Sequence, residues 1–436
     1  MSLRRTFWAV LALLILSGLA AYFTPMIAGV RTPVFFTRLV YLCLILIVLG
    51  YIWAYYSTHG FLLTRDARVL RQQVGQIFEE RFKLSNRSPF VRLWIEVRDD
   101  SQLPGNSGSR VLSLIGPRQQ RSYIAYTMLN RRGSFHLGPT TLVSGDPFGL
   151  FLNKKEIPTD NQLVVLPYYV ELTRFPSPVG MFPGGKAIQR RAAEITPQVT
   201  SVRDYAPGDA LRRIHWPTSA RKDRLMTKEF DQDPQADVWI FLDAYEPNYQ
   251  HPENAQQEEV SRVDQLWLWQ QRPEVKLPHD SFEYAVSSAA SVANYYIRGG
   301  RTVGFVCASD VFIALSPERG ERQLNKILEN LTFINSNGSL PLMGLVEAQA
   351  PSLPRASTVV LVTTTAGEST DLAVDYLIMR NLRPVVVFID KHSFETESNG
   401  SHGDSDIVYR LKQRGIPVQI VKYGDDLTVA LETEVI

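Results

Sequence analysis

The sequence predicts a two-helix membrane anchor followed by a β-sandwich and then a doubly wound α/β domain. Three observations lead there: two apolar runs within the first 60 residues, short alternating strands up to residue 175, and longer apolar strands alternating with helices from residue 237. A chain of 436 residues is too long for one ordinary hydrophobic core. We expect an anchor at 1–60, a sandwich at 61–175, a linker at 176–236 and an α/β domain at 237–436.

The anchor is predicted from two runs without a charged residue, Phe7–Phe23 and Leu39–Tyr56. Each is close to the ~20 residues with which a helix crosses the hydrocarbon layer. Arg4 and Arg5 precede the first run, so a cleaved signal peptide is the alternative reading. No clear small-x-small cleavage site follows and the second run begins soon after, which favours a retained hairpin of two helices.

Basic residues predict the orientation of this hairpin. Arginines outside the two runs outnumber those in the link between them: Arg4, Arg5, Arg65, Arg68 and Arg71 lie outside, and Arg31 and Arg38 lie in the link. The positive-inside rule then places both termini in the cytoplasm. The two cysteines, Cys43 and Cys307, suit a reducing compartment, so we expect a two-helix cell-membrane protein with a cytoplasmic body and the lipid bilayer as a partner.

The composition argues against several classes of function. The balance of 46 basic and 44 acidic residues gives a net charge of +2, which does not predict nucleic acid as a partner. The seven histidines form no HExxH spacing, and the chain has no GxSxG elbow and no Walker motif. We therefore expect no cofactor and no enzymatic activity, whereas the oligomeric state does not follow from the sequence.

The first soluble part reads as strands after a short helix. Residues Asp66–Arg81 resemble a helical stalk that leaves the bilayer. Runs with alternating apolar residues then recur about every ten residues, separated by Pro, Gly, Asn and Ser. This spacing predicts a small β-sandwich, with its end marked by SGDPFGLF at Ser144–Phe151.

Between the two soluble domains lies a dense polar segment, Ser201–Asp233, in which arginines and lysines alternate with acids. It permits two readings. In one it is a charge-paired connector with Tyr205 and Trp216 as apolar plugs, which the neutralising acids favour. In the other its surplus arginines bind an anion or a partner.

The same segment carries a family resemblance. Residues Arg203–Arg221 read R-D-Y-x-P-G-D-x-x-R-x-I-x-W-x-x-S-A-R, and Leu225–Phe230 read L-x-x-K-E-F. Together with RRGSFHLGPTTLVSGDPFGLF at Arg131–Phe151, these runs resemble the signature of the domain-of-unknown-function family 58. The resemblance implies a C-terminal half similar to a von Willebrand factor A domain and an association with MoxR-type AAA+ ATPases.

The resemblance also raises the question of a metal. A von Willebrand A domain that binds a divalent cation uses D-x-S-x-S after its first strand, because a hard cation needs clustered oxygen ligands. Here Asp243 is present, but Tyr245 and Pro247 stand at the two serine positions, and Thr364 stands near the place of a second Asp. We expect a degenerate site without metal, in which Glu246 is the one substitute ligand.

These observations together predict a membrane-anchored scaffold or adaptor whose partner is a MoxR-type ATPase in the assembly or maturation of envelope or protein complexes. The predicted partner-binding residues are Arg203, Asp204, Tyr205, Asp209, Arg212, Trp216, Arg221 and Asp243. The alternative is a membrane-surface enzyme for an anionic or glycan substrate, with Asp209, His215 and Asp243 close together. A metal-dependent adhesion module is a third reading.

Overall fold

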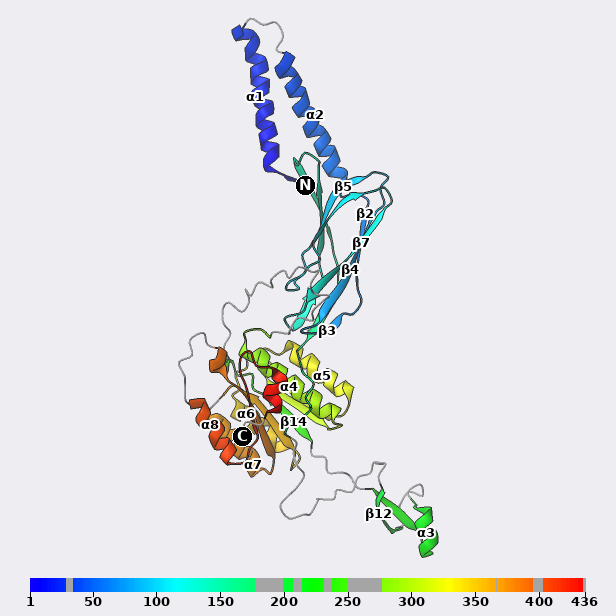
Figure 1. Cartoon of the computed structure of the whole chain (residues 1–436), viewed down its shortest axis with the longest axis vertical. Helices are drawn as coiled ribbons and strands as arrows, with labels where there is room; N and C mark the ends of the chain where they lie inside the picture. The colour runs from blue at the N-terminus through cyan, green and yellow to red at the C-terminus, as the bar shows by residue number, and fades with distance from the viewer. Residues whose placement is uncertain are drawn as a thin grey trace. The chain divides into compact units, whose positions relative to one another are not determined.

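The computed structural model describes residues 1–28, 34–176, 199–206, 214–230, 237–249, 277–365, 367–394 and 403–433. The chain divides into two compact units, the first containing Met1–Tyr168 and the second containing Tyr169–Glu253 and His279–Ile436 (Figure 1). The two predicted apolar helices and a body of several sheets are present.

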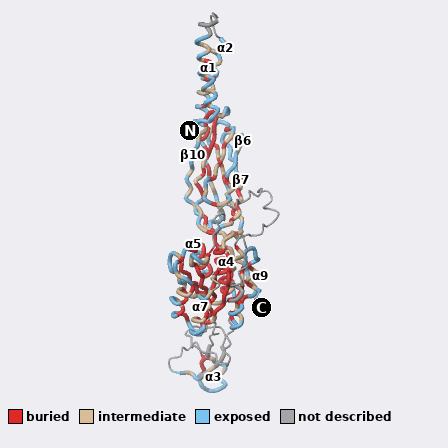
Figure 2. Tube along the Cα trace, turned by 90° about the vertical axis from the view of Figure 1, so that its left-hand side faces the viewer, coloured by how far each residue is buried: buried red, intermediate tan, exposed pale blue. Residues whose placement is uncertain are grey.

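The N-terminal helices are α1 (Arg5–Ala28) and α2 (Val34–Ser57), which contact each other. At about 1.5 Å per residue, 24 residues span about 36 Å, which exceeds the ~30 Å hydrocarbon layer. Both are long and apolar enough to cross a membrane by length and composition. In the most apolar stretch of each helix, only 6% of α1 and 11% of α2 is buried, so the protein itself leaves these side chains uncovered (Figure 2).

The first unit contains three sheets, ordered β1-β10-β9-β5-β6, β2-β4-β7 and β3-β11-β8. Their strands are β1 (Ser2–Leu3), β2 (Phe61–Ala67), β3 (Arg71–Gln73), β4 (Ile77–Asn86), β5 (Arg92–Asp99), β6 (Arg110–Ile115), β7 (Gln120–Met128), β8 (Gly133–His136), β9 (Thr140–Gly145), β10 (Phe151–Ile157) and β11 (Gln162–Leu166).

The helical stalk predicted at Asp66–Arg81 is wrong, because this segment contains the end of β2, all of β3 and the start of β4, joined by short turns. Strands β2 and β4 pair antiparallel from Phe61↔Asn86 to Ala67↔Glu80. The segment is rich in residues that favour helices in isolation, and pairing across the sheet overrides that local preference.

One hydrophobic core joins the five-stranded sheet of this unit to the three-stranded sheet β2-β4-β7. Side chains of β4 alternate between buried and less buried positions, as expected for a strand with one face on a core. Phe82 and Leu84 of β4 belong to the same cluster as Ile95 and Val97 of β5. The three-stranded sheet β2-β4-β7 and the five-stranded sheet therefore share their buried faces.

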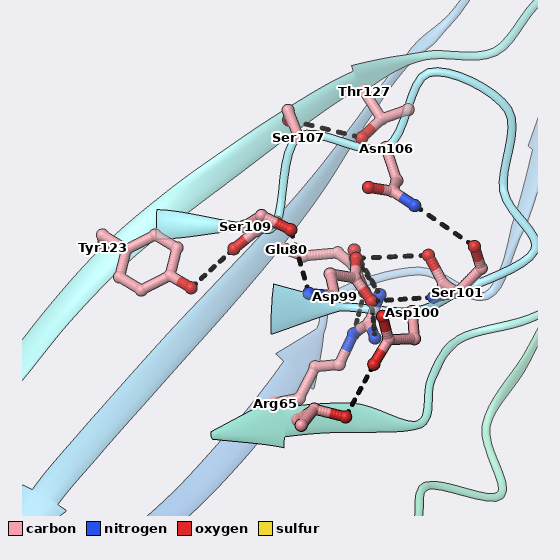
Figure 3. Close-up of polar contacts among 12 residues, drawn as sticks. Arg65, Glu80, Asp99, Asp100, Ser101, Asn106, Ser107, Ser109, Tyr123 and Thr127 are labelled. Carbon is pink, nitrogen blue, oxygen red and sulfur yellow. Dashed lines mark hydrogen bonds and ion pairs between the residues drawn. The ribbon is translucent and has the colours of Figure 1, made fainter. Parts of the chain in front are cut away.

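Beside this core lies a buried ionic triad of Arg65, Glu80 and Asp99, drawn in Figure 3. The Arg65 guanidinium donates to both oxygens of Glu80, at 2.6 and 2.8 Å, and to both oxygens of Asp99, at 2.9 and 3.2 Å. The three side chains are 3%, 1% and 0% exposed. Arg65 and Glu80 come from one sheet and Asp99 from the other, so the triad connects the two sheets.

The triad holds two carboxylates against one guanidinium. Burial raises the pKa of Glu80, although the hydrogen bonds and charge of Arg65 act in the opposite direction. Burial also disfavours the charged guanidinium, but its bonds to Glu80 and Asp99 outweigh that effect and raise the pKa of Arg65. Arg65 therefore stays charged, and burial favours the protonated form of Glu80.

The second unit is built on a six-stranded sheet ordered β16-β15-β14-β17-β18-β19, in which neighbours pair in parallel except β15 with β16. The strands are β14 (Val238–Leu242), β15 (Val303–Ala308), β16 (Phe312–Glu318), β17 (Thr358–Thr363), β18 (Arg383–Ile389) and β19 (Val418–Val421). Every residue of β14 is buried, as expected for a strand covered on both faces.

Helices cover this sheet on both faces. They are α4 (Ser281–Arg298), α5 (Glu321–Phe333), α6 (Leu342–Gln349), α7 (Glu368–Met379), α8 (Gly403–Gln413) and α9 (Leu427–Glu432), with short 3-10 turns at η2 (Glu246–Asn248), η4 (Ala350–Ser352) and η5 (Lys391–Phe394). Trp239 and Phe241 share a core with α6, α7 and α8. Because side chains alternate along a strand, Ile240 and Leu242 lie on the opposite face, and α4 also contacts β14.

Part of the predicted linker forms a small hairpin of its own. Strand β12 (Val199–Asp204) pairs antiparallel with β13 (Met226–Phe230), and the short helix α3 (Trp216–Lys222) precedes β13. We call these described residues, 199–206 and 214–230, the signature hairpin.

Replacing Arg65 by Met is expected to lower the free energy of unfolding by about 3–5 kcal/mol, because two buried carboxylates lose their common cation. The matched control is Lys83→Met, which removes the exposed pair of Lys83 with Asp66 at 2.7 Å and is expected to cost less than about 1 kcal/mol. Denaturant unfolding of the full chain in detergent, followed by circular dichroism, measures both. Equal losses would contradict a structural role for the triad.

The raised pKa of Glu80 gives a pH dependence with a defined sign. Between its ordinary value of 4.5 and the raised folded value, the folded state binds more protons than the unfolded state. The unfolding free energy should therefore fall as pH rises above about 4.5, and Glu80→Gln should remove that part of the slope. An unchanged slope in this variant, from unfolding curves at several pH values, would refute the assignment.

Candidate functional site

The signature hairpin is held together by a histidine that caps its helix. The backbone N–H of His215 donates to the Met226 carbonyl at 2.8 Å. Its ring nitrogen Nδ1 accepts from the Thr218 N–H at 3.2 Å and lies 2.7 Å from the Thr218 hydroxyl. Ser219 then links helix to strand, because its hydroxyl donates to the His215 carbonyl and accepts from the Met226 N–H. These bonds fix α3 against β13.

Trp216 is the most prominent side chain of this hairpin. It is the first residue of α3 and is 64% exposed. Leu225 is also exposed, as are the cations that surround this end of the hairpin: Arg221, Lys222 and Arg224. Among the hairpin residues whose burial is described, 202, 204–206 and 214–227, the buried ones are Ile214, Ser219, Met226 and Thr227. The reading of Trp216 as an apolar plug is therefore wrong for the described residues.

The other predicted residues of this segment have varied outcomes. Asp204 pairs with Arg224 at 3.2 Å, and because both are exposed the pair is worth at most about 1 kcal/mol. Tyr205 is half-buried and its N–H donates to the Leu225 carbonyl at 2.9 Å. Arg203 is placed by its backbone, opposite Thr227 in the β12–β13 ladder. Asp209 and Arg212 lie outside the described residues.

Asp243 lies elsewhere, at the carboxyl end of β14, and is 1% exposed. Its Oδ2 accepts from the Thr363 hydroxyl at 2.7 Å and from the Asn248 amide at 3.0 Å, with the Thr365 hydroxyl at 3.4 Å. Its Oδ1 accepts from the Tyr245 N–H at 3.0 Å. We call these residues the Asp243 cluster; it ties the end of β14 to the end of β17.

Burial also dominates the electrostatics of this cluster. It raises the pKa of Asp243, against the lowering effect of its four hydrogen-bond donors. It likewise raises the pKa of the Tyr249 phenol, whose hydroxyl donates to the Asp243 carbonyl, and the charge of Asp243 adds to this shift. The pKa of Cys307, on the adjacent strand β15, is raised by burial and by Asp243.

The hydrogen-bond donors around Asp243 occupy the oxygens that a metal ion would use. Both carboxylate oxygens already accept hydrogen bonds, and the Thr364 hydroxyl is used by the Asn248 carbonyl at 2.8 Å. Within the described ranges, no three His, Cys, Asp or Glu side chains come together as a metal site would need. These hydrogen bonds give Asp243 a structural role, because they tie the end of β14 to the end of β17.

The described residues do not test the predicted catalytic trio, because Asp209 is not among them. The Nδ1 of His215 is engaged by Thr218, the Asp243 carboxylate is buried, and Asp209 lies outside the description. The enzyme alternative stays a prediction.

A further site lies in the loop at Ser144–Phe151, which the sequence marked as the end of the sandwich and as part of the family signature but not as a functional site. The Asp146 carboxylate is buried and accepts the N–H groups of Phe148, at 2.9 Å, and Phe151, at 2.6 Å. The ring of Phe151 lies 5.3 Å from Phe7 of α1 and 5.8 Å from Tyr51 of α2. This loop therefore joins the sheets to both apolar helices, and the motif DPFGLF was its one sequence signal.

Comparison with known proteins gives a family match and one relative. Residues 201–266 match the model of the family described as "Protein of unknown function DUF58". This range includes Asp243 and all of the signature hairpin except residues 199 and 200. The chain is 22% identical over 387 residues to the "Uncharacterized protein YeaD" of Bacillus subtilis (strain 168), covering 85% of each protein.

Two solved structures resemble part of the chain. The CARDB domain of a Pyrococcus furiosus protein is 12% identical, with coverage of 24% of this chain and 91% of that one and a TM-score of 0.17. The complex of zinc 2-glycoprotein and prolactin inducible protein from human seminal plasma has a chain 8% identical, with coverage of 24% and 93% and a TM-score of 0.19. TM-scores this low establish no shared fold.

The burial of Cys307 predicts that its thiol does not react in the folded protein. With Cys43→Ala as background, alkylation of Cys307 by iodoacetamide should be slower than that of an exposed Val311→Cys control (with Cys307→Ala) by roughly two orders of magnitude. Both should react alike in denaturant. Comparable rates in the folded full-length protein would show that the end of β15 is open to solvent.

Proposed function

We propose that this protein is a membrane-anchored, cytoplasm-facing adaptor that binds a partner protein through the signature hairpin. The observation that carries the proposal is the exposure of Trp216 on a helix fixed by its own hydrogen bonds. Trp and Arg dominate the binding energy of protein interfaces, and a surface that is already ordered loses less entropy on binding.

Support for the anchor comes from α1 and α2 and their attachment. The N–H of Arg4, just before α1, donates to the Leu150 carbonyl at 3.1 Å, and α2 ends four residues before β2 begins. If both helices span the bilayer, both outer ends and the first unit lie on one side of it. The excess of arginine at those ends supports the cytoplasmic side.

The second unit supports an adaptor by resemblance. Its buried parallel strands alternate with helices on both faces, which fits a doubly wound sheet similar to a von Willebrand A domain. In a cation-dependent version of that domain the Asp of the first strand serves the metal, whereas here Asp243 serves Thr363, Asn248 and Tyr245. Interaction without a metal is the reading that this chemistry supports, and the family resemblance points to a MoxR-type AAA+ ATPase as partner.

The test is photo-crosslinking in native membranes with a benzoyl-phenylalanine at Leu225, which is exposed beside α3. We expect capture of an AAA+ ATPase, reduced at least about tenfold by Trp216→Ala, as for loss of an interface hot spot worth about 1.4 kcal/mol or more. The matched control is Tyr409→Ala on α8, where the aromatic ring is 61% exposed.

Both variants must first be shown to be folded and inserted. Equal capture by wild type and Trp216→Ala would contradict the proposed surface. Because the ATPase is cytoplasmic, its capture would also establish the orientation of the body, and capture of periplasmic proteins alone would overturn it.

A further inference from the structure

Four loops of the first unit lie at the end where the apolar helices join it. The strand registers place them together, because Phe61 pairs with Asn86, Arg92 with Ile115, Ser85 with Gln120, and Gly145 with Leu152. The connecting loops 57–60, 87–91, 116–119 and 146–150 therefore share one end of the sheets.

Backbone hydrogen bonds tie these loops to one another. The Arg87 N–H donates to the Gly60 carbonyl at 2.8 Å, and the Arg118 N–H donates to the Ser88 carbonyl at 3.3 Å. The buried amide of Asn86 donates to the Gly116 carbonyl at 2.9 Å. We call residues 87–91, 114–119 and 146–150 the loop end; it is one connected surface beside the ends of α1 and α2.

Large apolar side chains of the loop end are exposed. Phe90 is 69% exposed, Leu114 is 65% exposed and Phe148 is 53% exposed. Leu114 also has φ 51°, a backbone conformation that leucine rarely adopts. Each of the three lies in a different segment of the loop end, so the exposure is a property of this whole end of the unit.

The exposed charge of the loop end is positive. Arg87 and Arg118 are both exposed. The one acidic residue in these three segments is Asp146, which is 2% exposed and is bound by the N–H groups of Phe148 and Phe151. Aromatic rings with arginines and without exposed acids complement the interfacial layer of a membrane with anionic lipids.

The chain between α2 and the loop end is so short that this surface lies close to any bilayer that α2 spans. Helix α2 ends at Ser57 and Gly60 follows three residues later, a separation of at most about 11 Å. With about 36 Å of helix in a ~30 Å hydrocarbon layer, a centred α2 extends about 3 Å beyond the layer at each end, so its last residues reach the headgroups. A bilayer around α2 is therefore within reach of the loops bonded to Gly60.

We propose that the loop end is a lipid-binding surface: Phe90, Leu114 and Phe148 enter the interfacial layer, and Arg87 and Arg118 bind anionic headgroups. The inference rests on the proposed membrane anchor and adds a second attachment to it. Its consequence is that the first unit is held against the bilayer by its own loops as well as by the two helices.

The test uses spin labels on the full chain in nanodiscs of phosphatidylcholine with and without phosphatidylglycerol. In a Cys43→Ala, Cys307→Ala background, single labels replace Phe90 or Phe148, with Val69→Cys at the opposite end of β2 as the exposed control and Leu44→Cys in α2 as the lipid reference. Oxygen partitions into lipid and a nickel chelate into water. With phosphatidylglycerol, labels at 90 and 148 should show an oxygen-to-nickel accessibility ratio at least threefold that at 69.

The charge is tested by an Arg87→Gln, Arg118→Gln double variant, which should show no gain from phosphatidylglycerol. Labels at 90 and 148 that match residue 69 in both lipids would overturn the proposal, as would labels shielded from both reagents, which would mean cover by protein. Equal immersion with and without phosphatidylglycerol would overturn the headgroup binding. If the label at 44 is also in water, the anchor itself has failed, and this outcome separates the two proposals.

Discussion

The contact between Arg65, Glu80 and Asp99 is the constraint on which the first unit depends. A guanidinium buried to 3% exposure must have both carboxylates in place, because an unpaired charge at that depth costs several kcal/mol. The sheets therefore have one relative position in which all four hydrogen bonds form. Neighbouring residues adapt to it: a Cβ on Gly108 would lie 2.5 Å from the Asp99 carboxylate, and the ring of Phe82 lies under Arg65 and is stacked on Tyr123. A buried ion pair of this kind contributes more to a single geometry than to net stability.

The same strands that hold the triad end at the loops beside the helices. Glu80 pairs with Ala67 and Asp99 with Thr140, at the end of the sheets remote from Phe61 and Gly145. Fixing the sheets at one end therefore fixes the loops at the other, including the Asp146 loop, which contacts α1 and α2. The second unit uses a buried carboxylate in a similar way, since Asp243 orders the ends of β14 and β17. In both units buried acids order the ends of strands, whereas Trp216 and the loop end are exposed and are the surfaces proposed for binding.

Sequence patterns predicted what depends on local periodicity. The apolar runs gave the helices, and the all-apolar run at Val238–Leu242 gave a buried parallel strand. Sequence patterns failed where contacts between residues far apart in the chain determine the local structure. Residues Asp66–Arg81 became strands because β4 pairs with β2, and Arg65 meets Asp99 from 34 residues away. Of the two readings of Trp216, the apolar plug does not fit its exposure, since the hairpin buries Ile214 and Met226, whereas its predicted role in partner binding stays a prediction. The motif DPFGLF marks the loop of Asp146, but its contacts with Phe7 and Tyr51 of the apolar helices join residues distant in the sequence, which no local pattern predicts.

The measurement that tests the adaptor most directly is the affinity of the full-length protein, in nanodiscs, for the purified MoxR-type ATPase of the same cell. Biolayer interferometry measures this affinity for wild type, Trp216→Ala and Tyr409→Ala. The account predicts saturable binding by wild type and Tyr409→Ala, with affinity reduced at least about tenfold in Trp216→Ala. Binding that is equal in all three, or absent from the folded wild type, would contradict it.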